Sequence, residues 1–380
     1  MRIGIDYTSA LNQRAGIGRF TRELVAALLA GDDGDDYVLL RPRRPRSDVP
    51  PALRQRATVR SLPLTDWGMT VLWQRLRLPL PMDWLTGPLD VFHAPDFLLP
   101  PLRRTPAVLT VHDLTFLRYP EHAPPGLASF LSAALPRSLE RASLVLADSV
   151  CTRDDLVSLL GMPPAKIEVV PGGVEARFAP ADEAAQREAM ARHGLESPFI
   201  LSVGTLEPRK NLGRLVDAYA RLVREAGIPH LLALAGGRGW GYEPLLAQIA
   251  QSGLESRVRL LGHVPDADLP PLLSAATVFV FPSLYEGFGL PVLEAMACGA
   301  AIVCSDASCI PEVAGDAALL APPSDEPALA AAIHRLLHDA DLRRTLSSRA
   351  RARAAGFTWE AAAQKTLAAY HRAAATRRVA

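Results

Sequence analysis

Short apolar runs alternate with longer amphipathic stretches along the whole chain. Runs of about four or five apolar residues predict strands, and stretches with apolar residues every three or four positions predict helices. In the first half the predicted strands are Ile3–Asp6, Tyr37–Leu40, Val91–His93, Ala107–Val111, Leu144–Ala147 and Ile167–Val170. The predicted helices there are Gly18–Leu29, Pro125–Arg141 and Thr152–Leu160. This alternation is typical of parallel α/β units.

The second half repeats the pattern with shorter connections. Its predicted strands are Phe199–Val203, Leu231–Ala235, Val258–Leu261, Val278–Phe281, Ala301–Cys304 and Ala318–Leu320. Its predicted helices are Asn211–Arg224, Glu243–Gln251, Leu269–Ala275, Pro291–Ala297, Glu326–Leu337 and Leu342–Ala354. A polar segment without a strong core signal, Val174–Pro198, separates the halves. We therefore expect two doubly wound domains, residues 1–175 and 176–357, that share a ligand cleft at the carboxyl ends of their strands.

Composition excludes several classes of protein. Of the 380 residues, 49% are apolar and 21% are charged, as in a soluble globular protein. The net charge of +1 argues against a general nucleic-acid binder. The longest uncharged stretch, Leu269–Tyr285, contains three prolines and is too short to span a bilayer. The amino terminus carries an acid at Asp6 and does not resemble a signal peptide, so we expect a cytoplasmic protein.

The four cysteines and three lysines differ in what they indicate. Cys151, Cys298, Cys304 and Cys309 lack the spacing of a metal site, so we interpret them as small buried apolar residues. Lysine occurs only at Lys166, Lys210 and Lys365 among 41 basic residues. A lysine at a suggestive place is therefore worth examining.

Two glutamates stand at the junction between a strand and a helix. Glu286 lies in the loop after Val278–Phe281, and Glu294 lies about one turn inside the helix that Pro291 begins. Their separation, on the order of 12 Å at helical rise, suits an extended ligand with hydroxyls at both ends. Gly287 and Gly289 allow backbone to approach a ligand closely. The alternative is that both acids are solvated surface charges.

Arg209 and Lys210 follow the strand Phe199–Val203 and precede an amphipathic helix. Two adjacent cations beside a helix amino terminus suit a diphosphate, with arginine binding in bidentate fashion and lysine acting as a point charge. Alternatively, both are surface charges next to a helix cap at Asn211.

Two features of the first half are weaker. His112 ends the strand Ala107–Val111, where it would hydrogen-bond a substrate hydroxyl or stabilise a departing phosphate, or else have a structural role. Gly16 and Gly18 open a helix after the first strand, but Thr21 replaces the third glycine of a dinucleotide-binding fingerprint. We interpret Trp67, Trp73 and Trp84 as packing residues. We interpret the arginine-rich stretch 41–46 as a solvated loop in preference to a lipid contact.

These motifs together resemble the retaining glycosyltransferases of family 4, which have the GT-B fold. The second half carries Gly-Thr-Leu-Glu-Pro-Arg-Lys-Asn and Tyr-Glu-Gly-Phe-Gly-Leu-Pro-Val-Leu-Glu-Ala-Met-Ala-Cys-Gly. The first half carries Ala-Gly-Ile-Gly-Arg-Phe-Thr-Arg-Glu-Leu, Phe-His-Ala-Pro-Asp-Phe-Leu-Leu-Pro, Val-His-Asp-Leu and Val-Val-Pro-Gly-Gly-Val. The resemblance covers about residues 1–375 and departs from the family at Gly172-Gly173, where relatives usually carry Asn-Gly.

The resemblance implies two Rossmann-like domains facing each other, with a terminal helix at about 358–376 crossing back to the first. It also implies a role for each motif. Arg209 and Lys210 would hold the donor diphosphate, Glu286 would lie near the donor sugar, and Glu294 would bind the ribose hydroxyls. His112 would face the transferred sugar. The remaining donor contacts implied are Gly16, Gly18, Gly204, Gly287, Phe288, Gly289 and Leu290.

The implied reaction is transfer of a hexose from a nucleotide-diphosphate sugar, with retention of configuration and without a metal or other cofactor. The first-half motifs most resemble bacterial mannosyltransferases of polysaccharide assembly, so we expect GDP-mannose as donor. The acceptor would be a glycan or a lipid-linked sugar, which leaves peripheral contact with the inner face of the membrane open. Two alternatives share this architecture: a nucleotide-sugar epimerase and a non-catalytic protein that binds sugar nucleotides. A phosphorylase would need a pyridoxal phosphate on lysine, for which no lysine has an evident context.

Overall fold

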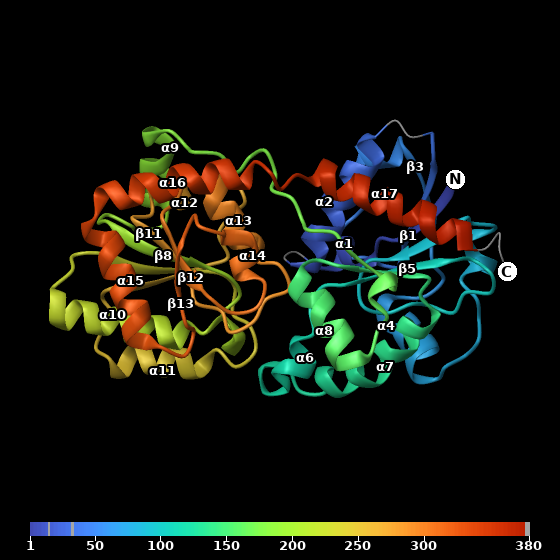
Figure 1. The fold of residues 1–380 in the computed structure, drawn as a ribbon, viewed down its shortest axis with the longest axis horizontal. Helices are drawn as coiled ribbons and strands as arrows, with labels where there is room; N and C mark the ends of the chain where they lie inside the picture. Colours follow the sequence, from blue (N-terminus) through green and yellow to red (C-terminus); the bar gives the residue numbers. More distant parts are fainter. Residues whose placement is uncertain (14–15, 32–33, 377–380) are drawn as a thin grey trace. The chain divides into compact units, whose positions relative to one another are not determined.

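Each half of the chain builds its own parallel sheet with helices on both faces (Figure 1). The computed structural model describes residues 1–13, 16–31 and 34–376. One unit comprises Met1–Gly173 together with Thr358–Ala380, and the other comprises Val174–Phe357. Among the described residues, no helix has both the length and the apolar character needed to cross a bilayer.

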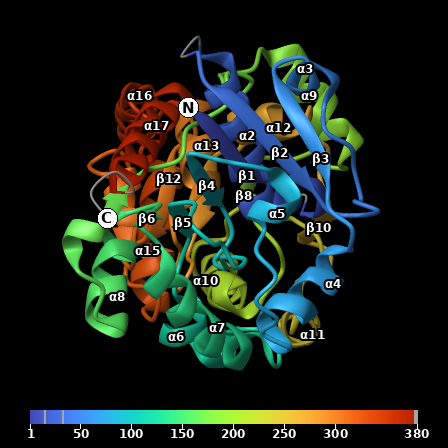
Figure 2. The same cartoon turned by 90° about the vertical axis from the view of Figure 1, so that its right-hand side faces the viewer.

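The first unit contains a seven-stranded parallel sheet in the order β3-β2-β1-β4-β5-β6-β7. Figure 2 shows the strands from β3 to β6 following one another across it. The strands are β1 (Arg2–Asp6), β2 (Asp36–Arg41), β3 (Ala57–Ser61), β4 (Val91–Ala94), β5 (Ala107–Val111), β6 (Leu144–Ala147) and β7 (Ile167–Val169). The α-helices are α1 (Thr8–Asn12), α2 (Ile17–Ala30), α3 (Pro51–Arg54), α4 (Asp66–Thr70), α5 (Asp83–Thr86), α6 (Thr115–Arg118), α7 (Leu127–Arg141) and α8 (Val150–Leu160). Short helical turns add η1 (Val71–Arg75), η2 (Pro120–His122) and η3 (Pro164–Lys166).

The second unit contains a six-stranded parallel sheet in the order β10-β9-β8-β11-β12-β13. Its strands are β8 (Phe199–Val203), β9 (Leu231–Ala235), β10 (Val258–Gly262), β11 (Val278–Phe281), β12 (Ile302–Ser305) and β13 (Leu319–Ala321). Its helices are α9 (Glu183–Arg192), η4 (Pro208–Lys210), α10 (Leu212–Ala226), α11 (Glu243–Gln251), α12 (Leu269–Ala275), α13 (Leu290–Ala297), α14 (Ile310–Ala314), α15 (Glu326–His338) and α16 (Ala340–Ala354). In both sheets the strand order reverses direction beside the first strand, which is where such folds bind ligands.

All twelve strands predicted from the sequence are present, with small differences at their ends. The structure adds β3, which the sequence does not predict. This strand pairs only with β2, at the edge of the sheet, and its residues are exposed or half-buried. An edge strand of this kind lacks the apolar run that marks the buried strands, which is why its pattern was not recognised.

Helix α17 (Trp359–Thr376) belongs to the first unit, where it runs beside α2 (Figure 1). Tyr370 is fully buried, and its hydroxyl lies 2.7 Å from Nδ1 of His93 on β4. Trp359 packs edge-on against Phe20 of α2. A Cβ on Gly173 would lie 2.3 Å from the backbone nitrogen of Trp359, so only glycine fits where the chain returns. The resemblance correctly implied that the terminal helix returns to the first domain.

The interpretation of the three tryptophans as packing residues is wrong for two of them. Trp67 is 72% exposed and Trp84 is 66% exposed, so neither is a packing residue. Trp73 is half-buried, and its indole nitrogen donates a hydrogen bond to the carbonyl of Leu80. The error arose because the surrounding loops are long and irregular, and a local pattern does not reveal which apolar side chains such loops expose.

Candidate active site

The turn that carries Arg209 and Lys210 is held firmly in the second unit. It forms η4, directly after β8 and the loop at Gly204. Asn211 follows with a positive φ of 56°, and its side-chain amide donates to the carbonyls of Pro282 (3.0 Å) and Pro323 (2.8 Å). A Cβ on Gly236 would lie 1.9 Å from the carbonyl oxygen of Gly204, so the loops after β8 and β9 pack closely. These contacts fix the cation pair against the end of β11, the neighbour of β8 in the sheet.

Glu286 lies between the two cations. One carboxylate oxygen accepts a hydrogen bond from Lys210 Nζ, and the other accepts one from Arg209 Nη1, both at 2.6 Å. Burial by itself raises the pKa of Glu286, but the charges of Arg209 and Lys210 lower it to about 2. The carboxylate is therefore ionised at neutral pH and holds both cations in place.

The charges of this cluster are balanced. Arg209 also donates to Glu207, at 2.7 Å, so two cations face two carboxylates. Burial, together with the neighbouring Arg209, lowers the pKa of Lys210. The adjacent cations predict a diphosphate site, and the resemblance implies that Glu286 lies near the sugar; the structure adds a direct contact between Glu286 and the cations. A ligand anion at the cations would therefore compete with Glu286 for their hydrogen bonds.

Glu294 is 3% exposed on α13, so it is not a solvated helix residue. Its charge acts on Arg177 and on the thiol of Cys298, which places both groups in its neighbourhood. Burial, with a smaller contribution from Glu294, raises the pKa of Cys298 to about 12. Cys298, Cys304 and Cys309 are buried, as expected from the sequence, whereas Cys151 is half-buried.

Steric contacts explain why the segment before α13 is rich in glycine. Gly289 caps the helix with a φ of 94°, and a Cβ there would lie 2.7 Å from Cδ1 of Ile310. Phe288 is buried beside Phe357, and α13 begins at Leu290. The carbonyl of Glu286, just before Gly287, accepts a bond from the thiol of Cys309. The backbone from 287 to 290 is thus closely surrounded, and its contact with a donor stays a prediction.

His112 lies in the first unit, at the end of β5, and both of its ring nitrogens are engaged. Nδ1 lies 2.7 Å from a carboxylate oxygen of Asp148, and Nε2 lies 2.7 Å from the carbonyl oxygen of Pro95. Burial lowers the pKa of His112, but Asp148, together with Asp96 and the carbonyl of Pro95, outweighs this effect and raises it to about 9. The imidazole is therefore a cation that donates both protons within its own domain. Its contact with a sugar stays a prediction.

Gly16 and Gly18 are explained by packing around α2. Gly16 precedes the helix with a φ of 56°. A Cβ on Gly18 would lie 2.1 Å from the carbonyl oxygen of Gln13, so only glycine allows α2 to start so close to the end of α1. Part of the loop between them, residues 14–15, lies outside the described residues. The two glycines thus have a structural reason that is independent of any donor.

Comparison with known proteins decides the family. The model of glycosyl transferases group 1 matches residues 185–353, and that of Glycosyltransferase Family 4 matches residues 14–178. The O-antigen chain mannosyltransferase B of Escherichia coli is 34% identical over 367 residues, covering 93% of this chain and 95% of that protein. The chain is a family 4 glycosyltransferase.

Two further relatives extend the comparison. The serotype-specific mannosyltransferase WbdA of Escherichia coli is 32% identical over 258 residues, which cover 66% of this glycosyltransferase and 32% of WbdA. The sucrose-phosphate synthase of Thermosynechococcus elongatus aligns with a TM-score of 0.76 at 23% identity, over 99% of this chain and 100% of that structure. The chain therefore has the GT-B fold and resembles bacterial mannosyltransferases. The matches do not favour an epimerase or a non-catalytic binding protein.

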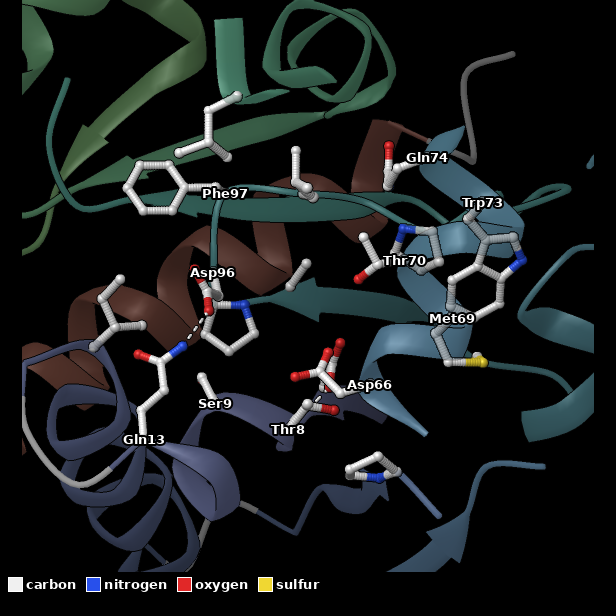
Figure 3. A pocket seen from close by; sticks show the side chains of 18 of the residues that line it. Thr8, Ser9, Gln13, Asp66, Met69, Thr70, Trp73, Gln74, Asp96 and Phe97 are labelled. Atoms are coloured by element: carbon white, nitrogen blue, oxygen red, sulfur yellow. Dashed lines mark hydrogen bonds between the residues drawn. The ribbon is translucent and has the colours of Figure 1, made fainter. Parts of the chain in front are cut away.

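The first unit of the glycosyltransferase also contains a cavity of about 430 Å³ that the sequence did not reveal (Figure 3). Its walls combine apolar and polar side chains from distant segments. The lining includes Asp6, Thr8, Gln13, Asp66, Met69, Trp73, Asp96, Phe97, Phe130 and Leu131. Two of the acids follow strands directly, Asp6 at the end of β1 and Asp96 two residues after β4. That position was the only sequence signal that could have indicated the cavity.

Proposed function

We propose that this glycosyltransferase moves mannose from GDP-mannose to a hydroxyl of a glycan or lipid-linked acceptor, with retention of configuration. The observation that carries the donor site is the buried contact of Glu286 with Arg209 and Lys210, at the ends of two adjacent strands. This contact holds two cations together at the proposed diphosphate site. The mannose assignment is supported by two relatives whose names give mannosyltransferase activity.

In this proposal the residues act mainly by positioning and by electrostatic stabilisation. Arg209 and Lys210 bind the diphosphate and offset the charge that develops on the leaving nucleotide. Glu286 orients these cations and lies near the sugar, while Glu294 accepts hydrogen bonds from the ribose. The backbone from Gly287 to Leu290, with Gly204, contacts sugar or phosphate. Gly16 and Gly18 belong to the loop that approaches the donor, and His112 faces the transferred sugar.

The proposed bond changes need no metal or other cofactor. The acceptor oxygen bonds to the anomeric carbon on the face from which the diphosphate oxygen leaves, through an oxocarbenium-like state. The proton of the acceptor hydroxyl passes to the departing diphosphate. Two cations close to that diphosphate stabilise the charge it gains.

We place the protein in the cytoplasm, with peripheral contact to the membrane that carries a lipid-linked acceptor. The segment around α4 and α5 exposes large apolar side chains, among them Trp67, Leu76 and Trp84. The exposed Arg75 and Arg77 belong to the same segment. Exposed tryptophans together with arginines suit an interface with anionic lipid.

A thermal-shift panel tests the donor. GDP-, UDP-, ADP- and dTDP-sugars are each compared with the bare nucleotide, with and without added divalent metal. We expect selective stabilisation by GDP-mannose and GDP, independent of metal. Glu294→Ala should weaken that shift because the ribose loses a hydrogen-bond partner, whereas the exposed Glu196→Ala in the same unit should not. Selective stabilisation by another nucleotide would show that the donor is not GDP-mannose. An equal donor-induced thermal shift in both variants would show that Glu294 does not bind the donor.

A further inference from the structure

The cavity in the first unit has the size of a small-molecule site. Its volume of about 430 Å³ lies in the range of roughly 300–1,000 Å³ that is typical of ligand pockets. Apolar surface comes from Met69, Trp73, Phe97, Phe130 and Leu131. The indole of Trp73 is fixed by its hydrogen bond to Leu80. A rigid aromatic surface of this kind can pack against the apolar face of a sugar ring.

Three carboxylates contribute to the polar surface, beside neutral polar side chains. Asp6 accepts a bond from the backbone N–H of Thr8 at 3.0 Å, Asp66 from Asn12 at 3.2 Å, and Asp96 from Gln13 at 3.0 Å. Figure 3 shows the Gln13–Asp96 pair, Thr8 and Asp66 around the hollow. A carboxylate has about four acceptor positions, so these bonds leave capacity for ligand hydroxyls. Among the described residues, no group of three such side chains could hold a metal ion.

The charge of this lining is one-sided. Among its described residues there are three aspartates and no lysine, arginine or histidine. The cation behind the wall, His112, donates one proton to the carbonyl of Pro95, itself a lining residue, and the other to Asp148. It therefore has no N–H to offer to a ligand in the cavity. A phosphate there would find no cationic donor and would face carboxylates, and such like-charge contact opposes binding. Burial raises the pKa of Asp6, and that of Asp96 to about 6, so the repulsion strengthens as pH rises above about 6.

We propose that the carboxylates of this cavity make the enzyme select an uncharged, hydroxyl-rich acceptor sugar over a phosphorylated one. The carboxylates accept the hydroxyl protons, and the aromatic surface packs against the ring. The inference rests on the proposed glycosyl transfer and names the class of acceptor for it. Selectivity comes as much from repulsion of the wrong ligand as from attraction of the right one.

The test compares acceptors that differ only in charge. Methyl glycosides of mannose, glucose, galactose and rhamnose are offered beside their monophosphates, with the donor that the thermal-shift panel identifies. We expect kcat/KM at least about tenfold higher for the best neutral glycoside than for any monophosphate. Use of monophosphates with equal or better kcat/KM, or use of no neutral glycoside at all, would overturn the inference.

Variants assign the effect to the cavity. Asp66 is exposed at its rim on α4, so Asp66→Asn and Asp66→Lys should fold normally. We expect Asp66→Asn to raise the KM of the neutral acceptor about three- to tenfold, with donor KM unchanged, because a hydrogen-bond acceptor loses its charge. Asp66→Lys should bring kcat/KM for a monophosphate to within about threefold of that for the neutral sugar. Asp96→Asn, which keeps an oxygen for Gln13, should act like Asp66→Asn.

Asp154→Asn is the matched control. Asp154 is exposed in the same unit, pairs with Arg153 and does not line the cavity. If the Asp66 variants behave like this control, the cavity is not the acceptor site. Donor-induced stabilisation is measured in the same samples. A normal donor-induced thermal shift without a preference for neutral acceptors would overturn only this inference. The absence of a thermal shift with every nucleotide would overturn the proposed function.

Discussion

In each unit one buried ionised group lies between its hydrogen-bond partners, and these two groups have opposite sign. In the second unit the anion Glu286 lies between the cations Arg209 and Lys210. In the first unit the cation His112 lies between the anion Asp148 and the carbonyl of Pro95. Both groups stay charged at neutral pH because their partners outweigh the cost of burial.

The difference matches what each unit is proposed to bind. The second unit assembles cations, which suit a diphosphate. The cavity of the first unit exposes carboxylates, which suit hydroxyl groups. In the proposal, the cations of the second unit favour an anionic donor, and the carboxylates of the cavity favour a neutral acceptor.

The largest effect is expected from Lys210→Ala. It leaves Glu286 buried with one cation fewer, which should cost about 3 kcal/mol of stability, and it should weaken donor binding at least about tenfold. Denaturant unfolding and calorimetric titration of the donor measure the two effects. Lys166→Ala, an exposed lysine, is the matched control and should change neither.

The double variant Lys210→Ala/Glu286→Gln separates stability from binding. Removing the stranded carboxylate charge should recover much of the stability, because no unpaired anion then remains buried. Donor affinity should stay low, because the cation is still missing. Recovery of both properties would show that Lys210 acts only through Glu286.

The next effect is the dependence of stability on pH, which should differ in sign between the clusters. The pKa of Glu286 is about 2, below its ordinary value of 4.5, so its contribution is complete above 4.5 and is lost as pH falls toward 2. The pKa of His112 is about 9, above its ordinary 6.5, so its contribution is complete below 6.5 and is lost as pH rises toward 9. Burial raises the pKa of Asp148 even beside His112, so protonation of Asp148 adds stability as pH falls and offsets part of the acid loss.

Urea unfolding from pH 3 to pH 9.5 measures both slopes. Glu286→Gln should flatten the acid side only, and His112→Gln should flatten the alkaline side only. If one substitution flattens both sides, the clusters are coupled and the comparison fails.

Of these variants, His112→Ala should change donor affinity least. It should lower turnover more than it lowers donor affinity. The imidazolium is part of the first unit and is held away from solvent, so donor affinity should change less than about twofold. Turnover should fall about tenfold or more because the substitution removes a fixed charge near the proposed sugar site. Single-turnover kinetics beside donor titration measure the split. A loss of donor affinity that matches the loss of turnover would make His112 a binding residue.

The fold was predictable because burial leaves a strong local pattern. Buried strands such as Val278–Phe281 are continuous apolar runs, whereas the half-exposed edge strand Ala57–Ser61 lacks that signal. The contact of His112 with Asp148 could also have been found. Asp148 directly follows β6, the neighbour of β5, and the ends of adjacent parallel strands meet.

The remaining features depend on long-range geometry. The direct contact of Glu286 with both cations depends on side-chain conformations across two loops, which sequence spacing does not determine. The cavity of the first unit is lined by Asp66 and Trp73 from the irregular stretch between β3 and β4, together with Asp6 and Phe97. No local periodicity connects those segments, so the sequence predicted neither the cavity nor its charge.

The position of α17 has a consequence for how the protein is made. On a ribosome the segment Met1–Gly173 emerges first, yet the space beside His93 stays empty until Tyr370 has been synthesised. The segment Val174–Phe357 is continuous and can close on itself earlier. Domains generally complete folding in order from the amino terminus. Here the order is inverted, because the first unit begins to be translated before the second and is finished after it.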